Sequence, residues 1–536
     1  MRWVRPLSAR LAEPAAVLGA KAHGLVALHR LGLPVPPGFV VTTGACRAFL
    51  REGRLPGGLR QELAAAVGDL AAATGRRFGG PDRPLAVSVR SGAGVSMPGM
   101  MSTVLNLGLT AEAAAGLAAE TGDPGFALDS RLRFLTTFGA ALTGAEFPRD
   151  PLHGPAEDAV AAVEAAVARR CGRPVPHDPL DQLAAAVEAV FSSWDTPRAR
   201  TYRDLHGIPH DLGTAVVVQA MVFGNRDDRS GTGIAFSRDP TTGERTPFGD
   251  VLLGRQGEDV VSGREPTPPL RELRAREPGV WAALTGALAR IEDHYRDACY
   301  TEFTFESGAL WLLQVRPGRF TGAAAIRVAA DLADEGAITR DEALLRVSPE
   351  DVRRARTPRI AASARAAPLA RGVGACPGVA VGRIATTAEA AVRMAADGPV
   401  VLVRPETSPH DMRGLAAAAG IATARGGPAS HAAVVARTLG TPAVVGAAGL
   451  VVGAEGGGIR AGGRTVPEGT LVAVDGTGGE IVLGRPPVVA GAADAHLGRL
   501  LTWADAVAGA DAASDSPGGD DAARLAAAHA VLRREG

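Results

Sequence analysis

The spacing of hydrophobic residues predicts alternating helices and strands over the first hundred residues of the chain. Residues 21–31 and 59–74 have apolar side chains at helical spacing, whereas PVPPGFVVTT and PLAVSVRSG are short apolar runs beside Pro and Gly. Residues 111–206 carry Ala, Leu, Val and Glu at helical spacings and are interpreted as a helical insertion. From 213 to 320, β-branched runs separated by Gly, Asp and Pro predict strands of one sheet. The pattern therefore predicts an α/β first domain over residues 1–354.

A change in composition separates this domain from a second one. Residues 355–373 have no apolar periodicity and are rich in Ala, Arg and Pro, which is typical of a linker. A compact α/β unit is predicted over residues 374–486, with Gly-rich hairpin turns near its end. Residues 487–536 predict a helical tail from which no further core can be built. The predicted fold class is multidomain α/β.

Composition and charge narrow the classes of partner. The chain has 536 residues, and its 57 basic residues balance 57 acidic ones, so charge gives no argument for nucleic acid or membrane binding. The four cysteines are far apart without CxxC spacing, which predicts neither a disulfide framework nor a zinc site. No apolar stretch reaches a membrane-spanning length, and the N-terminus lacks a signal-peptide pattern. We therefore expect a cytoplasmic protein with small-molecule partners.

One lysine stands out against this composition. Lys21 is the only lysine, because arginine occupies every other basic position. An ammonium group is a compact, strongly hydrated charge, whereas a guanidinium group is planar, so a bias that stops at one position suggests a specific role for that lysine. Phosphate binding is one such role. The alternative is that Lys21 is an accidental survivor of the bias.

The segment GIATARGGPASHAAVVARTLGTP carries the candidate chemistry of the second domain. It predicts a strand at 421–424, a Gly-Gly-Pro turn, Ser430 as N-cap and a helix that ends at Gly440. His431 then lies at the helix N-terminus, where aligned peptide dipoles disfavour imidazolium and favour a bound anion. A neutral, nucleophilic imidazole and its phosphorylated product fit this position. Arg425, on the preceding turn, is a candidate contact for the transferred phosphoryl group, although a lone histidine after such a turn is more often structural.

These residues resemble known motifs. GGPASHAAVVAR is similar to the phosphohistidine motif of the phosphoenolpyruvate-utilising enzymes, with His431 at the phosphate-accepting position. Residues 88–108, 213–244 and 257–263 resemble the ATP-grasp half of the pyruvate phosphate dikinase family, and the resemblance runs from about 15 to 510. It implies an ATP-grasp nucleotide-binding domain with a helical insertion, followed by a swivelling phosphohistidine domain.

The resemblance also implies roles for residues that would hold ATP. Lys21, Arg90 and Arg316 match positions that contact the nucleotide phosphates, in agreement with the separate argument for Lys21. Glu258, in GEDVV, is a weaker candidate for the same site. ATP is thus the expected nucleotide substrate.

A magnesium site is implied by two further positions. Glu302 and Gln314 match residues that ligate or orient Mg²⁺ in the family, and oxygen ligands suit that ion. A hairpin loop of three or five residues centred on Gly308 would place them directly opposite each other, on one face. A two-residue Ser307-Gly308 turn would place them on opposite faces.

Two of the departures from the family pattern bear on the metal site and on the acceptor. Tyr300 stands where the family usually has an acidic residue, which removes one expected metal contact. The stretch LLTWADAVAG resembles the start of a C-terminal barrel that binds pyruvate and phosphoenolpyruvate in the family, and the residues that follow resemble an eroded first unit of it. We therefore expect this chain to lack that barrel.

The resemblance implies a dikinase-type reaction. His431 would attack the β-phosphorus of ATP and release AMP, and inorganic phosphate would then remove the terminal phosphoryl group as pyrophosphate. The histidine domain would swivel on residues 355–373 and pass the remaining phosphoryl group to an acceptor, such as pyruvate bound by a separate barrel protein. Two alternatives stay open: a stand-alone kinase of another small molecule, and a degenerate nucleotide-binding protein without activity.

Overall fold

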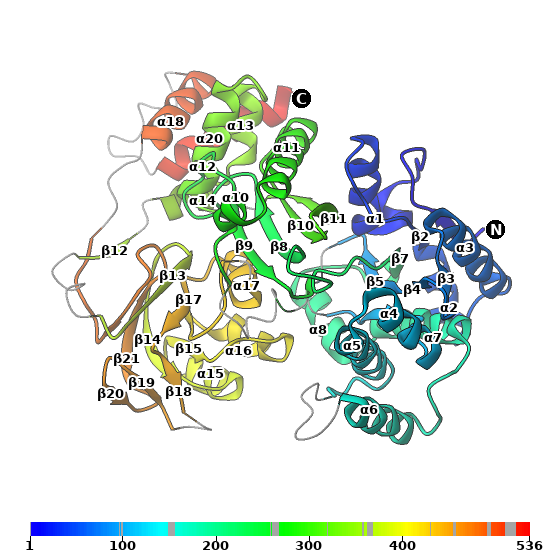
Figure 1. Cartoon of the computed structure of the whole chain (residues 1–536). Coiled ribbons are helices and arrows are strands. Elements are labelled where there is room, and N and C mark those ends of the chain that lie inside the picture. Colours follow the sequence, from blue (N-terminus) through cyan, green and yellow to red (C-terminus); the bar gives the residue numbers. More distant parts are fainter. Residues whose placement is uncertain are drawn as a thin grey trace. The chain divides into compact units, whose positions relative to one another are not determined.

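The computed structural model divides the chain into two compact units (Figure 1). The first comprises Met1–Ser230 and Thr304–Val315, and the second comprises Gly231–Phe303 and Arg316–Gly536. The first boundary thus falls inside the segment predicted as one domain. The structure describes residues 2–95, 97, 100–147, 156–257, 259, 267–318, 320–355, 358–361, 368–428, 430–453, 457–489, 495–509 and 521–535.

The first unit is built on an antiparallel sheet of order β1-β2-β7-β5-β6. Valines and other apolar residues of these strands are fully buried and pack against the surrounding helices in one core. The burial explains why the strands are rich in β-branched residues. The strands are β1 Val4–Pro6, β2 Gly38–Val41, β5 Val87–Ala93, β6 Thr103–Leu107 and β7 Thr214–Ala220, with the short pair β3 Arg77–Phe78 and β4 Pro84–Leu85 beside them.

Helices cover this sheet, and five of the described ones lie in the stretch expected to be a helical insertion. Their caps agree with the sequence signals: Thr110, Asp123, Asp178 and Thr196 each accept a backbone N–H at the start of a helix. The helices are α1 Ala15–Arg30, α2 Thr43–Glu52, α3 Leu59–Thr74, α4 Ala111–Thr121, α5 Pro124–Thr143, α6 Ala156–Cys171, α7 Pro179–Ser193 and α8 Pro197–Leu205, with the 3₁₀ turn η1 His210–Leu212.

Helix α1 is interrupted at Gly19. This residue has φ 77° and ψ 155°, far from helical values, and a Cβ atom there would overlap the carbonyl oxygen of Gly92. The glycine lets the chain pass against strand β5 and then restart its helix. Lys21 consequently lies in the first turn of the restarted segment.

A second sheet has the order β11-β10-β8-β9. Strands β8 Gly231–Phe236 and β9 Phe248–Leu253 are antiparallel, and β10 Cys299–Glu306 is joined to β11 Ala309–Pro317 by Ser307 and Gly308. Both turn residues have positive φ, 50° and 80°, as in a two-residue hairpin turn. Of the two kinds of loop considered, the two-residue turn is the one present, so the argument that Glu302 and Gln314 lie directly opposite each other fails.

Five helices of the second unit share one hydrophobic core. Apolar residues of α12, α13 and α14 pack against Leu497, Leu500 and Leu525 of α18 and α20. The expectation that the tail adds no core is wrong, because its Leu and Ala residues at helical spacing complete a core begun more than a hundred residues earlier. These helices are α12 Ala323–Asp334, α13 Arg340–Arg346, α14 Pro349–Ala355, α18 Ala495–Ala508 and α20 Asp521–Glu535; η2 Leu270–Glu272, α10 Leu273–Arg276 and α11 Pro278–Tyr295 precede them.

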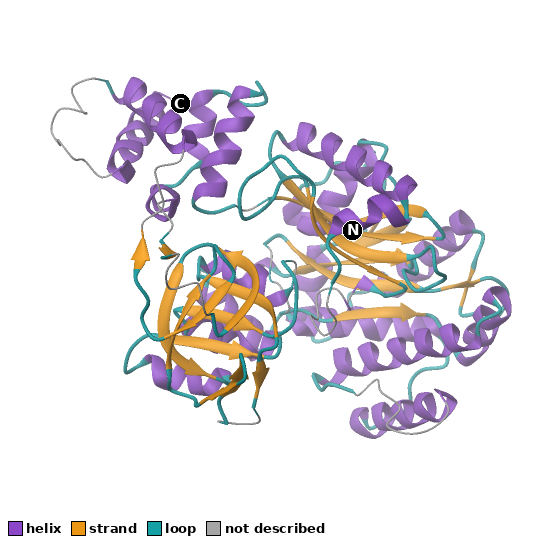
Figure 2. Cartoon of the chain, turned by 60° about the vertical axis from the view of Figure 1, so that its left-hand side comes forward, coloured by secondary structure: helices purple, strands orange, loops and turns teal. Residues whose placement is uncertain are grey.

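The second unit also contains a closed barrel of strand order β13-β17-β16-β15-β14-β21-β22 (Figure 2). One apolar cluster fills the barrel, and another joins its outer face to α15, α16 and α17. The strands are β13 Ala370–Cys376, β14 Val379–Ala385, β15 Val400–Arg404, β16 Gly420–Thr423, β17 Ala443–Ala448, β21 Leu471–Asp475 and β22 Glu480–Leu483, and the helices are α15 Ala388–Ala395, η4 Pro409–Asp411, α16 Met412–Ala417 and α17 His431–Leu439.

Short strands complete the barrel region. β18 Val451–Val452, β19 Ile459–Ala461 and β20 Arg464–Val466 form a small antiparallel sheet. β12 Arg359–Ile360, from the predicted linker, pairs with β23 Val488–Val489, so the two chain segments that enter and leave the barrel run side by side. Within the described part of the chain, no helix is long and apolar enough to cross a membrane.

The interruption of α1 gives a first prediction. Gly19→Ala should lower the free energy of unfolding by about 3 kcal/mol or more, because alanine disfavours this positive φ and its Cβ would meet Gly92. Gly68→Ala is the matched control, since Gly68 lies in α3 with open space around it, and it should stabilise by about 0.5–1 kcal/mol. Urea unfolding followed by circular dichroism measures both, and equal stabilities of the two variants would contradict the prediction.

Candidate functional site

His431 is the first residue of helix α17, as predicted. Strand β16 leads through the glycine turn to Ser430, which has extended backbone angles and occupies the N-cap position, and the helix ends at Gly440 in a left-handed conformation. The backbone N–H of Val434 donates to the carbonyl of Ser430, and the Ser430 hydroxyl makes no capping hydrogen bond. The imidazole therefore stands at a helix N-terminus, where unpaired backbone N–H groups favour an anion.

The two nitrogens of His431 have different surroundings. Nδ1 lies 3.0 Å from the hydroxyl oxygen of Thr407, on the loop after β15. Nε2 is buried, and among the residues that the structure describes it has no hydrogen-bond partner. If Nδ1 carries the proton and donates to Thr407, the lone pair of Nε2 stays available. The site thus offers one nitrogen held in place and one that can react.

Burial keeps this imidazole uncharged. Desolvation lowers the pKa of His431 from 6.5 to about 4, and the nearby Asp411 carboxylate opposes this only in part. Asp411 is itself buried, accepts from the backbone N–H of Ser408 and pairs with Arg404, whose Nε lies 3.2 Å from its carboxylate. At neutral pH the histidine is a neutral base.

Two arginines lie near the turn before His431, and one of them holds it in place. Arg437 lies in the same helix, six residues after His431. It donates to the carbonyl oxygens of Pro428 at 2.6 Å and Ala375 at 3.1 Å, and its side chain is buried. Arg425, the predicted phosphoryl contact, is half exposed and pairs with Glu406 at 2.6 Å. Arg425 therefore lies in the turn between β16 and α17, and its guanidinium forms an ion pair with a carboxylate.

Two of the predicted phosphate-binding residues lie on neighbouring elements of the first unit. Lys21 of α1 packs beside Gly92 of β5, two residues beyond Arg90 on the same strand. Arg90 is held by the side-chain oxygen of Gln219 and by the carbonyl of Leu313, the latter at 3.2 Å. Helix α1, strand β5 and the first part of β11 thus meet where Lys21 and Arg90 stand.

The predicted metal ligands differ in their surroundings. Glu302 is partly exposed, whereas Gln314 is buried. Along β10, Tyr300 and Glu302 share the half-exposed side; along β11, Gln314 continues the buried alternation of Leu310 and Leu312. No group of three or more His, Cys, Asp or Glu side chains suited to a metal ion occurs among the described residues.

Of the two remaining candidates for the nucleotide site, Arg316 is described by the structure and Glu258 is not. The guanidinium of Arg316 lies over the ring of Tyr300, with its carbon 5.8 Å from the ring centre. Glu258 falls outside the described residues, so its proposed contact stays a prediction.

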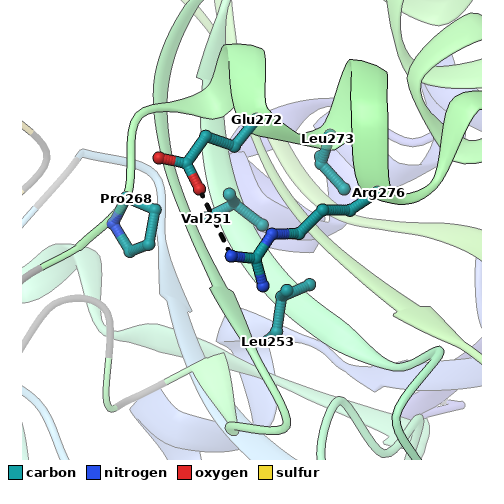
Figure 3. A pocket seen from close by; sticks show the side chains of 6 residues that line it. All are labelled: Val251, Leu253, Pro268, Glu272, Leu273 and Arg276. Atoms are coloured by element: carbon teal, nitrogen blue, oxygen red, sulfur yellow. Dashed lines mark ion pairs between the residues drawn. The ribbon is translucent and has the colours of Figure 1, made fainter.

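A small hollow beside β9 does not compete as a ligand site. Its volume of about 10 Å³ holds about one water molecule. Figure 3 shows Arg276 and Glu272 facing each other over it, 3.8 Å apart. The lining residues are Val251, Leu253, Pro268, Glu272, Leu273 and Arg276. A nucleotide would not fit in this space.

Comparison with known proteins finds two families, one matching the part of the chain with Lys21 and Arg90 and one matching the part with His431. Residues 15–74 and 52–277 match the family described as "Pyruvate phosphate dikinase, AMP/ATP-binding domain", and residues 396–479 match "PEP-utilising enzyme, mobile domain". Both matches occur in this one chain, in that order. Lys21 and Arg90 lie in the first match and His431 lies in the second, whereas Arg316 lies in neither.

Similarity to whole proteins extends over nearly all of the chain. It is 41% identical over 541 residues to the pyruvate, phosphate dikinase of Rhizobium meliloti (strain 1021) and 38% identical over 527 residues to that of Clostridium symbiosum; each alignment covers 94% of this chain and 60% of the relative. Pyruvate, phosphate dikinase 2 of Zea mays is 40% identical over 513 residues, which cover 92% of this chain and 58% of the relative. The chain thus spans about 60% of the length of the curated relatives it matches.

Sequence reasoning missed three residues that shape the site. Thr407 and Asp411 lie on the loop before α16, where Ser408 and Asp411 form a capping box that the spacing S-x-x-D could have revealed. Arg437 carries no such signal, because an arginine near the end of a helix is normally a solvated group that favours the helix dipole. Its burial against the turn is a tertiary feature.

The state of His431 gives a second prediction. In ¹⁵N-histidine NMR spectra, His431 should stay neutral around pH 6.5, with the proton on Nδ1, because burial moves its pKa to about 4. Since the folded-state pKa is lowered, the unfolded chain binds the extra proton first, so this residue's contribution to stability falls as pH drops from 6.5 toward 4. Comparison with His431→Asn assigns the signal, and titration with a midpoint near pH 6.5 would contradict the prediction.

Proposed function

We propose that this chain transfers phosphoryl groups from ATP to His431 in a dikinase-type reaction. The observation that carries the proposal is the neutral imidazole at the start of α17, with Nδ1 beside Thr407 and Nε2 without a partner among the described residues. A structural histidine would be expected to use both nitrogens in hydrogen bonds when buried. The similarity to pyruvate, phosphate dikinases over most of the chain supports the same reaction.

In the proposed reaction, Nε2 of His431 attacks the β-phosphorus of ATP. A bond forms between Nε2 and phosphorus, the bond to the α-phosphate oxygen breaks, and AMP leaves. Inorganic phosphate then takes the terminal phosphoryl group as pyrophosphate, and phosphohistidine remains. Thr407 accepts a hydrogen bond from Nδ1–H, which leaves the attacking lone pair on Nε2, and the N-terminus of α17 stabilises the added negative charge.

The nucleotide is proposed to lie in an ATP-grasp-type domain, with Lys21, Arg90 and Arg316 on its phosphates. Lys21 would supply a compact charge at the start of the restarted α1 segment, where backbone N–H groups also favour phosphate. Arg90 is pre-positioned by Gln219, which reduces the entropy lost when it binds an anion. Glu258 stays a further candidate for this site.

Magnesium is the ion that would accompany the ATP phosphates. In proteins it is commonly bound through one or two carboxylates together with substrate phosphates and water, so the partly exposed Glu302 fits as a single protein ligand. Gln314 was predicted to share its face, but the two-residue hairpin turn removes that argument. When bound, the ion would neutralise charge on the transferred phosphoryl oxygens.

Burial of Nε2 also requires movement. A nitrogen with no exposed surface cannot meet a phosphorus atom until its covering residues shift, so the histidine must be uncovered before each transfer. We propose that the barrel moves as a body on the two neighbouring segments that enter and leave it, whose strands β12 and β23 pair. The proposed hinge thus includes the segment around β23, which leaves the barrel, as well as the expected residues 355–373.

The final acceptor is proposed by analogy. Relatives of this chain are named pyruvate, phosphate dikinases, so pyruvate is the first acceptor to test, either directly or through a separate barrel protein. Another small-molecule acceptor would use the same phosphohistidine. A reaction with pyruvate and a reaction with another acceptor differ only in the second half, because His431 is phosphorylated first in both.

The central test uses ATP labelled at the β-phosphorus. The full chain with Mg²⁺ should acquire an acid-labile, base-stable label, His431→Asn should acquire none, and added phosphate should release pyrophosphate. His410→Asn is the matched control, since His410 is an exposed histidine on the same loop as Thr407, and it should label normally. Absence of label on the wild-type chain would leave a nucleotide-binding protein without this activity.

The role of Thr407 can be separated from a role in folding. Thr407→Val should slow labelling of His431 about tenfold or more, because without the hydroxyl the proton is free to sit on Nε2. Thr407→Ser restores the hydroxyl and should restore most of the rate. Single-turnover labelling and the NMR tautomer of His431 are the measurements, and equal rates for the valine and serine variants would contradict the assignment.

The single lysine gives a further test. Lys21→Arg keeps the charge but should slow labelling about tenfold or more, since a guanidinium group does not replace the compact ammonium. Arg10→Lys, an exposed change of the same type in reverse, is the control and should have no effect. Full activity of Lys21→Arg would mean that Lys21 is an accidental survivor of the arginine bias.

A further inference from the structure

Glu406 and Arg425 lie just beyond the carboxyl ends of two adjacent parallel strands of the barrel. Strands β15 and β16 pair in parallel up to their last residues. The pairing continues past the strand ends, because the backbone N–H of Arg425 donates to the carbonyl oxygen of Pro405 at 2.8 Å. The two side chains therefore extend from neighbouring backbone segments, and both belong to the same barrel as the proposed nucleophile.

The guanidinium of Arg425 and the carboxylate of Glu406 form an ion pair. Nη2 of Arg425 lies 2.6 Å from Oε2 of Glu406, and the two side chains are 50% and 31% exposed. Oε2 of Glu406 accepts no hydrogen bond among the described residues, so the contact lacks the alignment of a hydrogen bond. The backbone of Arg425 is fixed more firmly, since its carbonyl oxygen accepts from the hydroxyl of Thr423 at 2.7 Å. The main chain is thus held while the guanidinium can change partners.

A neighbouring ion pair has a different character. Nε of Arg404 lies 3.2 Å from the carboxylate of Asp411, whose side chain is 7% exposed, and Nη1 of Arg404 donates to the carbonyl of Thr386 at 2.9 Å. A buried carboxylate that loses its partner remains as an uncompensated charge, so we expect this pair to stay closed. A half-exposed pair contributes little to stability, because water solvates both groups when it opens. Glu406 and Arg425 are therefore the pair that can separate.

The residue after Glu406 contacts the histidine itself. The hydroxyl oxygen of Thr407 lies 3.0 Å from Nδ1 of His431, and the turn that carries Arg425 leads into helix α17. Two adjacent loop residues thus contact the proposed nucleophile and the proposed phosphoryl contact. A phosphoryl group on His431 would carry about two negative charges at neutral pH. It would compete with the carboxylate of Glu406 for the guanidinium of Arg425.

We propose that Glu406 is a displaceable counter-anion of Arg425, which holds the guanidinium while His431 is unphosphorylated and limits how tightly it binds the phosphoryl group afterwards. The proposal rests on the proposed function, since that phosphoryl group is the one His431 would carry. Guanidinium groups bind phosphate through charge-assisted, often bidentate hydrogen bonds. Binding that stabilises phosphohistidine more than the next transition state slows onward transfer. Glu406 opposes such binding by occupying Nη2 and by repelling like charge, and it is thus a positioning residue.

The kinetic test separates the formation of phosphohistidine from its use. Chain labelled from ATP at the β-phosphorus is given AMP and pyrophosphate, so that phosphohistidine, pyrophosphate and AMP return ATP, inorganic phosphate and free histidine. Glu406→Gln should raise the ratio of the labelling rate to the return rate about tenfold, mainly by slowing the return, because Arg425 then binds the phosphoryl group without competition. Arg425→Gln should label about tenfold more slowly, and the double variant should behave like Arg425→Gln.

The matched control is Glu389→Gln, which removes an exposed glutamate from α15 of the same barrel and should leave both rates unchanged. A role confined to holding the loop gives a different result. Glu406→Gln would then slow labelling and leave the return rate as in wild type, and this outcome would overturn the proposal.

Phosphate binding tests the ion pair without catalysis. Inorganic phosphate alone is titrated into the full chain labelled with ¹⁵N-histidine, and the ring signals of His431 are followed after assignment with His431→Asn. Glu406→Gln should bind phosphate at this site about tenfold more tightly than wild type, Glu389→Gln should match wild type, and adding Arg425→Gln should cancel the gain. If the wild type fails to label from ATP but these affinities hold, the dikinase function fails and the role of Glu406 stands. Equal phosphate affinities in wild type and Glu406→Gln overturn that role, whether or not the chain labels.

Discussion

The chemistry proposed for this chain depends on one buried imidazole that stays neutral and keeps one nitrogen free. Burial removes the hydration that would stabilise the imidazolium, so the ring of His431 is a base at neutral pH. The hydroxyl of Thr407 lies 3.0 Å from Nδ1, and when it accepts a hydrogen bond from Nδ1–H the lone pair is on Nε2. Burial alone would leave the tautomer undefined, and the hydroxyl alone would leave the ring free to protonate. The two effects together define a nucleophile.

That arrangement creates a conflict between reactivity and access. The desolvation that keeps His431 neutral also hides Nε2, the atom that must meet phosphorus. A static site could not satisfy both demands, whereas a barrel that moves between covered and uncovered positions can. Near the histidine, Arg437 of α17 lies over the ring of Phe236, and the backbone of Gly427, in the turn before α17, contacts Asp250 and Thr267.

Arginine takes part in most of these contacts. Arg437 holds the turn before the histidine, Arg425 pairs with Glu406, and Arg404 pairs with the buried Asp411. Arg437 uses the planar, multidentate guanidinium to bridge two backbone carbonyl oxygens. Lys21 has a different setting, at the restart of an interrupted helix beside a glycine strand. The setting of Lys21 thus differs from that of these arginines, and its role in phosphate binding stays a prediction.

The sequence by itself determined the local features of the site. The Gly-Gly-Pro turn, the Ser430 N-cap and the left-handed Gly440 depend on backbone preferences of a few adjacent residues, so the position of His431 at a helix start was predictable. The strands and helices of the first unit followed from hydrophobic periodicity in the same way. The interruption of helix α1 at Gly19 had no local signal, because it depends on close contact with the carbonyl oxygen of Gly92, more than seventy positions away.

Only the tertiary structure decided the contacts between distant segments. It brought Thr407 to Nδ1 of His431, returned α18 and α20 to a core begun by α12–α14, and joined Arg437 to Arg316 through two rings. It also set a two-residue turn where the residues Ser307 and Gly308 were compatible with several loops. Local propensities do not encode such choices, because the free energy of each depends on surface buried and charges paired between residues that become neighbours only after the chain has folded.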